Sequence, residues 1–144
     1  MWGQFAVMGV VLAVGFVPPH WPHSAHGALS AAGAVLAVAG GGIAVWSSRL
    51  LGRGFTPYPK PLQAGELVET GPYRAVRHPV YAGGLLFFFG YSLYTSMPAL
   101  AATAALAAVW GLKARVEERH LRERYPAYEG YADRVRFRLL PFVY

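Results

Sequence analysis

The sequence contains no cysteine, and this absence excludes several kinds of site at once. No disulfide, thiolate metal centre or cysteine nucleophile can form. Charge is also scarce: only 14% of the 144 residues are charged and 55% are hydrophobic, whereas a soluble domain averages about 25% charged residues. A chain of this length suffices for one domain. The composition therefore predicts a single membrane domain, residues 1–144.

Most of the chain has no formal charge at all. All thirteen Lys and Arg residues fall within 49–77 or 113–138, and all seven acids fall in the same two stretches. A soluble fold would scatter its charges, because most of its elements have a wet face. The net charge of +6 stands beside apolar segments, which favours contact with anionic lipid over nucleic acid.

Four apolar windows fill the remaining sequence: 1–17, 28–46, 80–94 and 97–112. A helix that spans a bilayer needs about 20 apolar residues, with a range of about 17–25. The first two windows qualify, and the last two can span if the bilayer thins or if the helices extend through 75–79 and 113–116. The first window has no basic start and no cleavage site, so we expect a retained helix. We predict an all-α integral membrane fold with about four transmembrane helices, two of them within 1–46.

The links between the windows set the expected topology. The link of residues 95–96 is too short for anything but a tight turn, so we expect the last two windows to form a C-terminal helical hairpin. This link and the link 18–27 are uncharged, and Lys and Arg collect on the cytoplasmic side. We therefore expect both termini and the 49–77 loop in the cytoplasm, in a multi-pass protein of the inner or plasma membrane. Within the second window, Gly33, Ala37 and Gly41 follow a four-residue spacing that allows close helix packing in lipid.

The densest cluster of unusual residues is GELVETGPYRAVRHPVYAGG, residues 65–84. Its tripeptide 70–72 (TGP) is a turn signal. The tripeptide 77–79 (RHP) opens the third window with a proline suited to the first helical position. A helix start offers free N–H groups and a partial positive charge, and the adjacent arginine and histidine make it a seat for a carboxylate or phosphate. Tyr73 and Tyr81 flank it and can face a cation or a base. Alternatively, these residues mark the lipid headgroup level.

A second cluster, EERHL at residues 117–121, follows the fourth window. Because the hairpin returns its two outer ends to one membrane surface, we expect His78 and Glu117 to be neighbours. An acidic pair beside a basic helix start suits a zwitterionic ligand.

The pattern GPYRxVRHPxYxG, a hairpin, EExxL and the tail residues 128–142 resembles the isoprenylcysteine carboxyl methyltransferase family. Related motifs occur in membrane phospholipid N-methyltransferases, and the resemblance covers about residues 58–142. It implies S-adenosylmethionine as cofactor, in a cytoplasmic pocket between 58–81, the hairpin and the tail. The implied cofactor-binding residues, with Arg77 added for its place at the helix start, are Gly65, Glu66, Leu67, Val68, Tyr73, Arg77, His78, Pro79, Val80, Tyr81 and Glu117.

The resemblance further implies methyl transfer to a lipophilic acceptor such as an isoprenoid or prenylcysteine carboxylate. Lys113 falls where family members typically have an acceptor-binding arginine. A carboxylate acceptor needs no general base, whereas an amine or hydroxyl needs one, for which Glu118 and His120 are the candidates. Arg134 is expected to orient an anionic acceptor or to contact lipid phosphate.

The same sequence is compatible with two other functions. One is a phospholipid or small-amine N-methyltransferase. Another is an NADPH-dependent membrane reductase, since sterol reductases share a similar C-terminal helical arrangement. His20, His23 and His26 have a spacing that can bind metal, but their proline-broken loop predicts no metal site. The expected partners are membrane lipid and a lipophilic or lipidated substrate, with no nucleic acid and no obligate protein partner.

The topology can be tested by cysteine labelling, because the natural chain has no cysteine. We expect Ser24→Cys to react with an impermeant maleimide only from outside and Gly130→Cys only from the cytoplasmic side of sealed vesicles. Labelling of both positions from the same side would contradict the topology.

Overall fold

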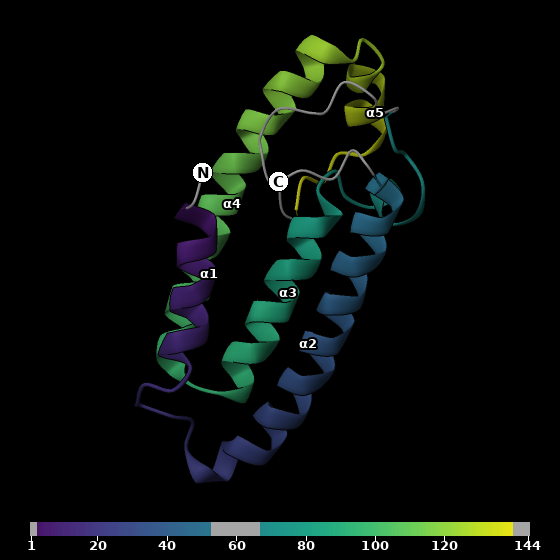
Figure 1. Cartoon of the computed structure of the whole chain (residues 1–144). Helices are drawn as coiled ribbons and strands as arrows, with labels where there is room; N and C mark the ends of the chain where they lie inside the picture. Colours follow the sequence, from purple (N-terminus) through teal and green to yellow (C-terminus); the bar gives the residue numbers. More distant parts are fainter. Residues whose placement is uncertain (1–2, 53–66, 140–144) are drawn as a thin grey trace.

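The computed structural model describes residues 3–52 and 67–139, and the described chain is helical with no β-strand (Figure 1). This confirms the predicted all-α fold. The elements in chain order are α1 (Gly3–Val14), α2 (His23–Leu51), the 3-10 helix η2 (Gly71–Arg74), α3 (Pro79–Tyr94), α4 (Met97–Arg124) and α5 (Tyr128–Arg134).

Two of these helices are long and apolar enough to cross a membrane: α2 with 29 residues and α4 with 28. α1 has 12 residues and α3 has 16, so at about 1.5 Å per residue both are shorter than the bilayer core of about 30 Å. The described chain thus has two helices of spanning length. The count of four spans stays a prediction.

Three helices differ in extent from the apolar windows. α2 begins at His23, five residues before its window, because polar residues continue a helix as readily as apolar ones. α3 begins at Pro79, the predicted first helical residue, and does not extend back through residues 75–78. α4 continues past the extension to residue 116 and ends at Arg124. Its last turns are rich in Glu and Arg, which are good helix formers.

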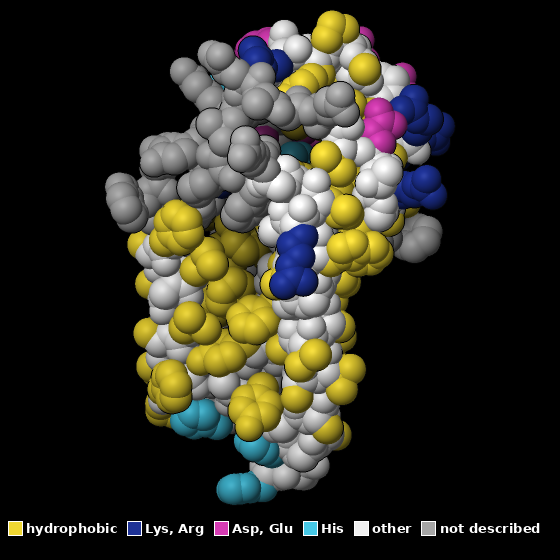
Figure 2. All heavy atoms as spheres, turned by 45° about the vertical axis from the view of Figure 1, so that its right-hand side comes forward, with side chains coloured by type: hydrophobic (Ala, Val, Ile, Leu, Met, Phe, Trp, Pro, Cys, Tyr) yellow, Lys and Arg dark blue, Asp and Glu magenta, His cyan; other side chains and the backbone are white. Residues whose placement is uncertain are grey.

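The two uncharged links meet at one end of the helices. Ser96 Oγ donates to the Val14 carbonyl at 3.1 Å, and Met97 N donates to the Pro19 carbonyl at 3.2 Å. Figure 2 shows histidines at this end, whereas the acidic side chains visible on the same face gather at the opposite end. The uncharged links and the visible acidic side chains therefore lie at opposite ends of the helices.

α2 and α3 lie antiparallel with their backbones in contact. A Cβ atom on Gly33 would lie 2.5 Å from the Gly90 carbonyl oxygen, and one on Gly40 would lie 2.6 Å from the Gly83 carbonyl oxygen. Each helix places its two glycines seven residues apart, the repeat that keeps one face of a helix against a partner. Small residues at these positions allow the close packing that holds helices together in lipid.

The predicted small-residue face was right in kind but wrong by one residue. The glycine in contact with α3 after Ala37 is Gly40, whereas a Cβ on Gly41 would meet only the Phe87 ring at 3.7 Å, an ordinary contact. A strict four-residue spacing drifts around a helix of 3.6 residues per turn, so a spacing of four and then three keeps the face.

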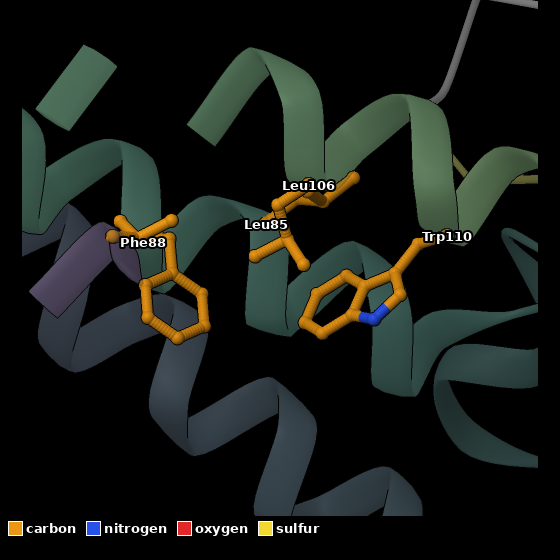
Figure 3. Close-up of a cluster of buried hydrophobic side chains, with 5 residues drawn as sticks. Leu85, Phe88, Leu106 and Trp110 are labelled. Atoms are coloured by element: carbon orange, nitrogen blue, oxygen red, sulfur yellow. The ribbon is translucent and has the colours of Figure 1, made fainter. Parts of the chain in front are cut away.

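A second packing region joins α3, α4 and α1. Its buried core consists of Val11, Leu85, Phe88, Leu106 and Trp110, four of which are labelled in Figure 3. α1 packs along α4, and α3 lies between α4 and α2 (Figure 1). These contacts hold the amino end of α3 beside the last turns of α4, where the motif residues lie.

The α2–α3 contact predicts a large effect from one methyl group. Gly40→Ala should destabilise the protein by about 2 kcal/mol, because the added Cβ overlaps backbone atoms that cannot move independently. Gly42→Ala is the matched control, since no atom lies within 4 Å of the added Cβ. Unfolding of both variants in detergent measures the difference, and equal stability would contradict the close contact.

Candidate active site

The segment that leads into α3 folds as the turn signal predicts. Gly71 has φ +60°, a left-handed conformation that glycine adopts without strain, and it is the first residue of η2. His78 is then the N-cap of α3, and Pro79 is the first helical residue, which confirms its predicted position. Arg77 and His78 are both buried.

Glu118 is the centre of a buried ionic network. Its side chain is 1% exposed, and Arg77 Nε donates to Oε1 at 2.9 Å. His78 Nε2 lies 3.2 Å from the same oxygen. Arg138 adds two bonds, from Nε to Oε1 at 3.1 Å and from Nη2 to Oε2 at 3.0 Å. Both oxygens of this carboxylate are therefore bonded to basic side chains of the protein.

The tail after α5 is fixed against the start of α3 by its backbone. Arg77 N donates to the Phe137 carbonyl and His78 N donates to the Arg138 carbonyl, both at 2.9 Å. Arg77 Nη1 also donates to the carbonyls of Ala132 at 3.4 Å and of Val135 at 3.3 Å, at the carboxyl end of α5. A cation is favourable there, because the last carbonyls of a helix lack internal partners.

α5 is held by aromatic residues. Tyr131 Oη donates to the Tyr73 carbonyl at 2.8 Å, and burial raises the pKa of Tyr131, so its hydroxyl stays a donor. The Tyr73 hydroxyl in turn donates to the Ser47 carbonyl at 3.3 Å, near the end of α2. Tyr73, predicted to bind cofactor, thus links α2 to α5 through its own two polar groups.

Glu117 faces a different set of side chains from Glu118. Its Oε2 lies 3.7 Å from His78 Nδ1, which confirms the predicted neighbourhood of the two residues. Tyr81 Oη donates to Glu117 Oε1 at 2.6 Å, and Lys113 Nζ lies 3.5 Å from the same oxygen. The His78 and Tyr81 rings are stacked with centroids 5.7 Å apart. His78 therefore lies between the two carboxylates, with one ring nitrogen toward each.

Lys113 joins this group to α1. Its ammonium donates to Gln4 Oε1 at 2.7 Å and lies 5.2 Å from the centroid of the Tyr81 ring. The side chain is 16% exposed, so the ammonium is largely enclosed. The residue predicted to bind the acceptor is thus beside the residues predicted to bind the cofactor.

The remaining predicted residues lie farther out. Leu67 and Val68 are half-buried, and Leu67 packs on the Tyr128–Tyr131–Val135 cluster. Arg134 is 62% exposed and forms an ion pair with Glu69 at 2.5 Å. Val80 is half-buried in the first turn of α3. Gly65 and Glu66 lie outside the described residues.

The histidines outside the motif form no recognisable site. His120 is half-buried, with Nδ1 2.8 Å from the Val116 carbonyl. His23 and His26 lie on α2, and His26 contacts Ser30. Among residues 3–52 and 67–139, no group of three His, Asp or Glu side chains is placed to hold a metal ion.

Sequence reasoning missed the roles of Arg138, Gln4 and Trp110. The motifs assign no role to Arg138, yet Arg138 bonds the buried Glu118. Gln4 stands in a window with no diagnostic pattern. Two buried polar atoms have no hydrogen-bond partner in the described chain: Trp110 Nε1 and Tyr128 Oη. Both lie on the elements that form the site.

Comparison with known proteins shows which family this chain belongs to. The model of the phospholipid methyltransferase family matches residues 29–128. The chain belongs to that family. The family is grouped with the isoprenylcysteine carboxyl methyltransferases, so the resemblance stated from the motifs is confirmed. Membership in this family points to a methyltransferase associated with membranes.

Two curated relatives match over about half of the chain. One is the cobalt-zinc-cadmium resistance protein CzcN of Cupriavidus metallidurans, 39% identical over 73 residues, which cover 48% of this chain and 33% of the relative. The other is the nickel-cobalt-cadmium resistance protein NccN of Alcaligenes xylosoxydans xylosoxydans, 36% identical over 72 residues, which cover 49% and 34%. The match thus spans about a third of the length of each relative.

We expect the buried ionic network around Glu118 to stabilise the fold. Glu118→Gln should cost about 3 kcal/mol or more, because it leaves the buried Arg77 guanidinium without its counter-charge. The same substitution at Glu69 removes an exposed ion pair and should cost less than about 1 kcal/mol. Denaturant unfolding of the two variants in the same detergent compares them, and a loss no larger at Glu118 than at Glu69 would contradict a stabilising role.

Proposed function

We propose that this protein uses S-adenosylmethionine to methylate a lipophilic acceptor at the cytoplasmic surface of the membrane. The observation that carries the proposal is the contact of His78, Tyr81 and Glu117 at the start of α3. These residues come from the two family motifs, RHPxY and EExxL, which are separated by the length of the hairpin.

The chemistry of these groups fits the proposed cofactor. Glu117 offers a carboxylate to the ammonium of an amino acid. The first turn of α3 supplies the N–H groups of Val80 and Tyr81, which lack helix-internal partners and suit a carboxylate. The stacked His78 and Tyr81 rings offer aromatic faces, to which a cation is attracted. We assign the cofactor to these residues, together with Tyr73, Pro79 and the segment Gly65–Glu66–Leu67–Val68 implied by the resemblance.

When bound, S-adenosylmethionine supplies an electrophilic methyl group, and the protein supplies position and a dry environment. Glu117 and the start of α3 bind the cofactor, and Lys113 binds the acceptor on the opposite side of the methyl group. Alignment of the reacting groups near about 3–3.5 Å contributes several kcal/mol to the barrier reduction. We assign Arg77 and Glu118 to positioning: their bond and the bonds of Arg138 fix the side chain of His78 and the tail around the site.

Two classes of acceptor differ in whether methyl transfer to them needs a proton acceptor. Transfer to an isoprenoid or prenylcysteine carboxylate needs no proton acceptor. Transfer to a phospholipid or small amine needs one, and the family description, phospholipid methyltransferase, favours keeping this alternative. Glu118 is bonded to three basic side chains, so it suits positioning better than proton transfer. This leaves His120, which is half-buried, as the candidate general base. Arg134 stays a candidate for contact with an anionic acceptor or lipid phosphate.

Both relatives are named for metal resistance.

Calorimetric titration with S-adenosylmethionine and with NADPH tests the proposal against the reductase alternative. We expect binding of S-adenosylmethionine only. Glu117→Gln should weaken it by about 1.5 kcal/mol or more, the value of a charge-assisted hydrogen bond, while the protein stays folded. Radiolabelled methyl transfer to lipid and isoprenoid acceptors should fall in parallel.

His23→Ala, at the uncharged end of the molecule, serves as the control and should bind like the natural protein. Binding of NADPH in place of S-adenosylmethionine, or full affinity in a folded Glu117→Gln variant, would overturn the assignment.

A further inference from the structure

Trp110 carries a polar atom that the fold buries and does not satisfy. The residue is 5% exposed, and its Nε1 has no hydrogen-bond partner in the described chain. An indole nitrogen is a donor only, so it needs an acceptor. Leaving it unpaired costs the desolvation of the N–H group, and such groups in folded proteins call for an explanation.

Packing fixes the orientation of this ring. Its six-membered ring lies against α3 at Gly84, where an added Cβ would approach the ring atoms within 2.8 Å. The indole also stacks on Tyr81, with centroids 5.4 Å apart, and meets the edge of Phe88 at 6.2 Å. Figure 3 shows the six-membered ring toward Phe88 and the nitrogen on the other part of the indole. The donor is therefore held by apolar contacts and not by a hydrogen bond of its own.

The nearest charged group on the same face of α4 is Lys113, three residues later. The two side chains share one neighbour: the Lys113 ammonium lies 5.2 Å from the centroid of the Tyr81 ring on which Trp110 stacks. Gln4 of α1 accepts a hydrogen bond from this ammonium at 2.7 Å. A buried donor and an enclosed cation thus stand together where α1, α3 and α4 meet.

We propose that Trp110 and Lys113 form the subsite for the polar head of the lipophilic acceptor, with Gln4 as the positioning residue that holds Lys113. The head is an anionic, oxygen-bearing group, a carboxylate or a phosphate. Its oxygen accepts the Trp110 N–H. Glu117 lies 3.5 Å from the Lys113 ammonium, and when Glu117 pairs with the ammonium of the cofactor, as the proposed function assigns, Lys113 balances the charge of the head. A cationic amine gains nothing from either group, because Trp110 cannot accept a hydrogen bond and Lys113 has the same charge. This inference rests on the proposed function and narrows its acceptor.

Two physical effects favour binding and selectivity at this subsite. Its donor is packed before the ligand arrives, so little side-chain freedom is lost when the acceptor binds. A site built to pair a buried polar group rejects a ligand that lacks the matching atom, because the buried group then stays unpaired. Trp110 thereby acts as a specificity-determining residue, and α1 becomes part of the site through Gln4.

The test uses the full-length protein in detergent micelles and three probes with one hydrocarbon chain: farnesoic acid, farnesyl phosphate and farnesylamine. Trp110 is replaced by 3-benzothienylalanine, which keeps the bicyclic shape and has sulfur in place of the N–H. We expect the Kd for one or both anionic probes to rise roughly fivefold or more, as for loss of a hydrogen bond to a charged group. The Kd for S-adenosylmethionine should not change. The natural protein should bind farnesylamine more weakly than at least one anion, and the substitution should not affect that binding.

The same replacement at Trp46, which is 55% exposed, is the matched control and should leave all three Kd values unchanged. Gln4→Leu should raise the Kd for the anions roughly twofold to fivefold, and raise the KM of methyl transfer while kcat is retained, because a positioning residue acts on binding through Lys113. A larger effect on the acid or on the phosphate identifies which head the subsite takes.

Unchanged affinity for both anions in the Trp110 variant, or binding of farnesylamine as tight as that of the anions, would overturn the subsite. Anion binding that depends on Trp110 in a protein without affinity for S-adenosylmethionine would support the subsite and refute the proposed methyl transfer.

Discussion

The buried carboxylate of Glu118 holds together parts of the chain that come from three different elements. Arg77 and His78 approach it from the start of α3, Arg138 approaches it from the tail, and Glu118 itself stands on α4. A carboxylate at 1% exposure is costly unless charge and hydrogen bonds compensate it, so the three basic partners and the acid depend on one another. The start of α3 and the tail are placed where they are because this one group must be satisfied.

That placement gives the neighbouring Glu117 its different surroundings. Successive residues of a helix point about 100° apart, so Glu118 turns toward the tail while Glu117 turns toward Tyr81 and Lys113. His78 contacts both carboxylates with its two ring nitrogens. One acid thus anchors the fold and the other remains beside aromatic rings and an ammonium. An adjacent acidic pair serves two purposes because the helix separates its two side chains.

The membrane helices provide the frame for this arrangement. α2 and α3 meet through glycines at backbone distance, and such a contact tolerates little sliding of one helix on the other. It fixes the height of the α3 start, and the apolar contacts around Trp110 fix α4 beside it. Together these contacts bring the RHPxY and EExxL motifs of a phospholipid methyltransferase family member to one point. α1 completes the frame through the bond of Gln4 to Lys113.

The sequence by itself determined the helical class, the turn at Gly71, the place of Pro79 and the proximity of His78 to Glu117. Each of these follows from a local rule. The charges are confined to two stretches, turn residues mark the turn, and proline favours the start of a helix. The link between the last two windows is too short to separate the two helices of the hairpin. Only the tertiary structure decided that Arg138 bonds Glu118, that Gly40 and not Gly41 meets α3, and that Gln4 reaches Lys113. It also decided that the indole N–H of Trp110 is buried with no hydrogen-bond partner in the part of the chain that the structure describes. These features depend on distant segments that meet with a particular rotation and height, and no local pattern encodes either quantity.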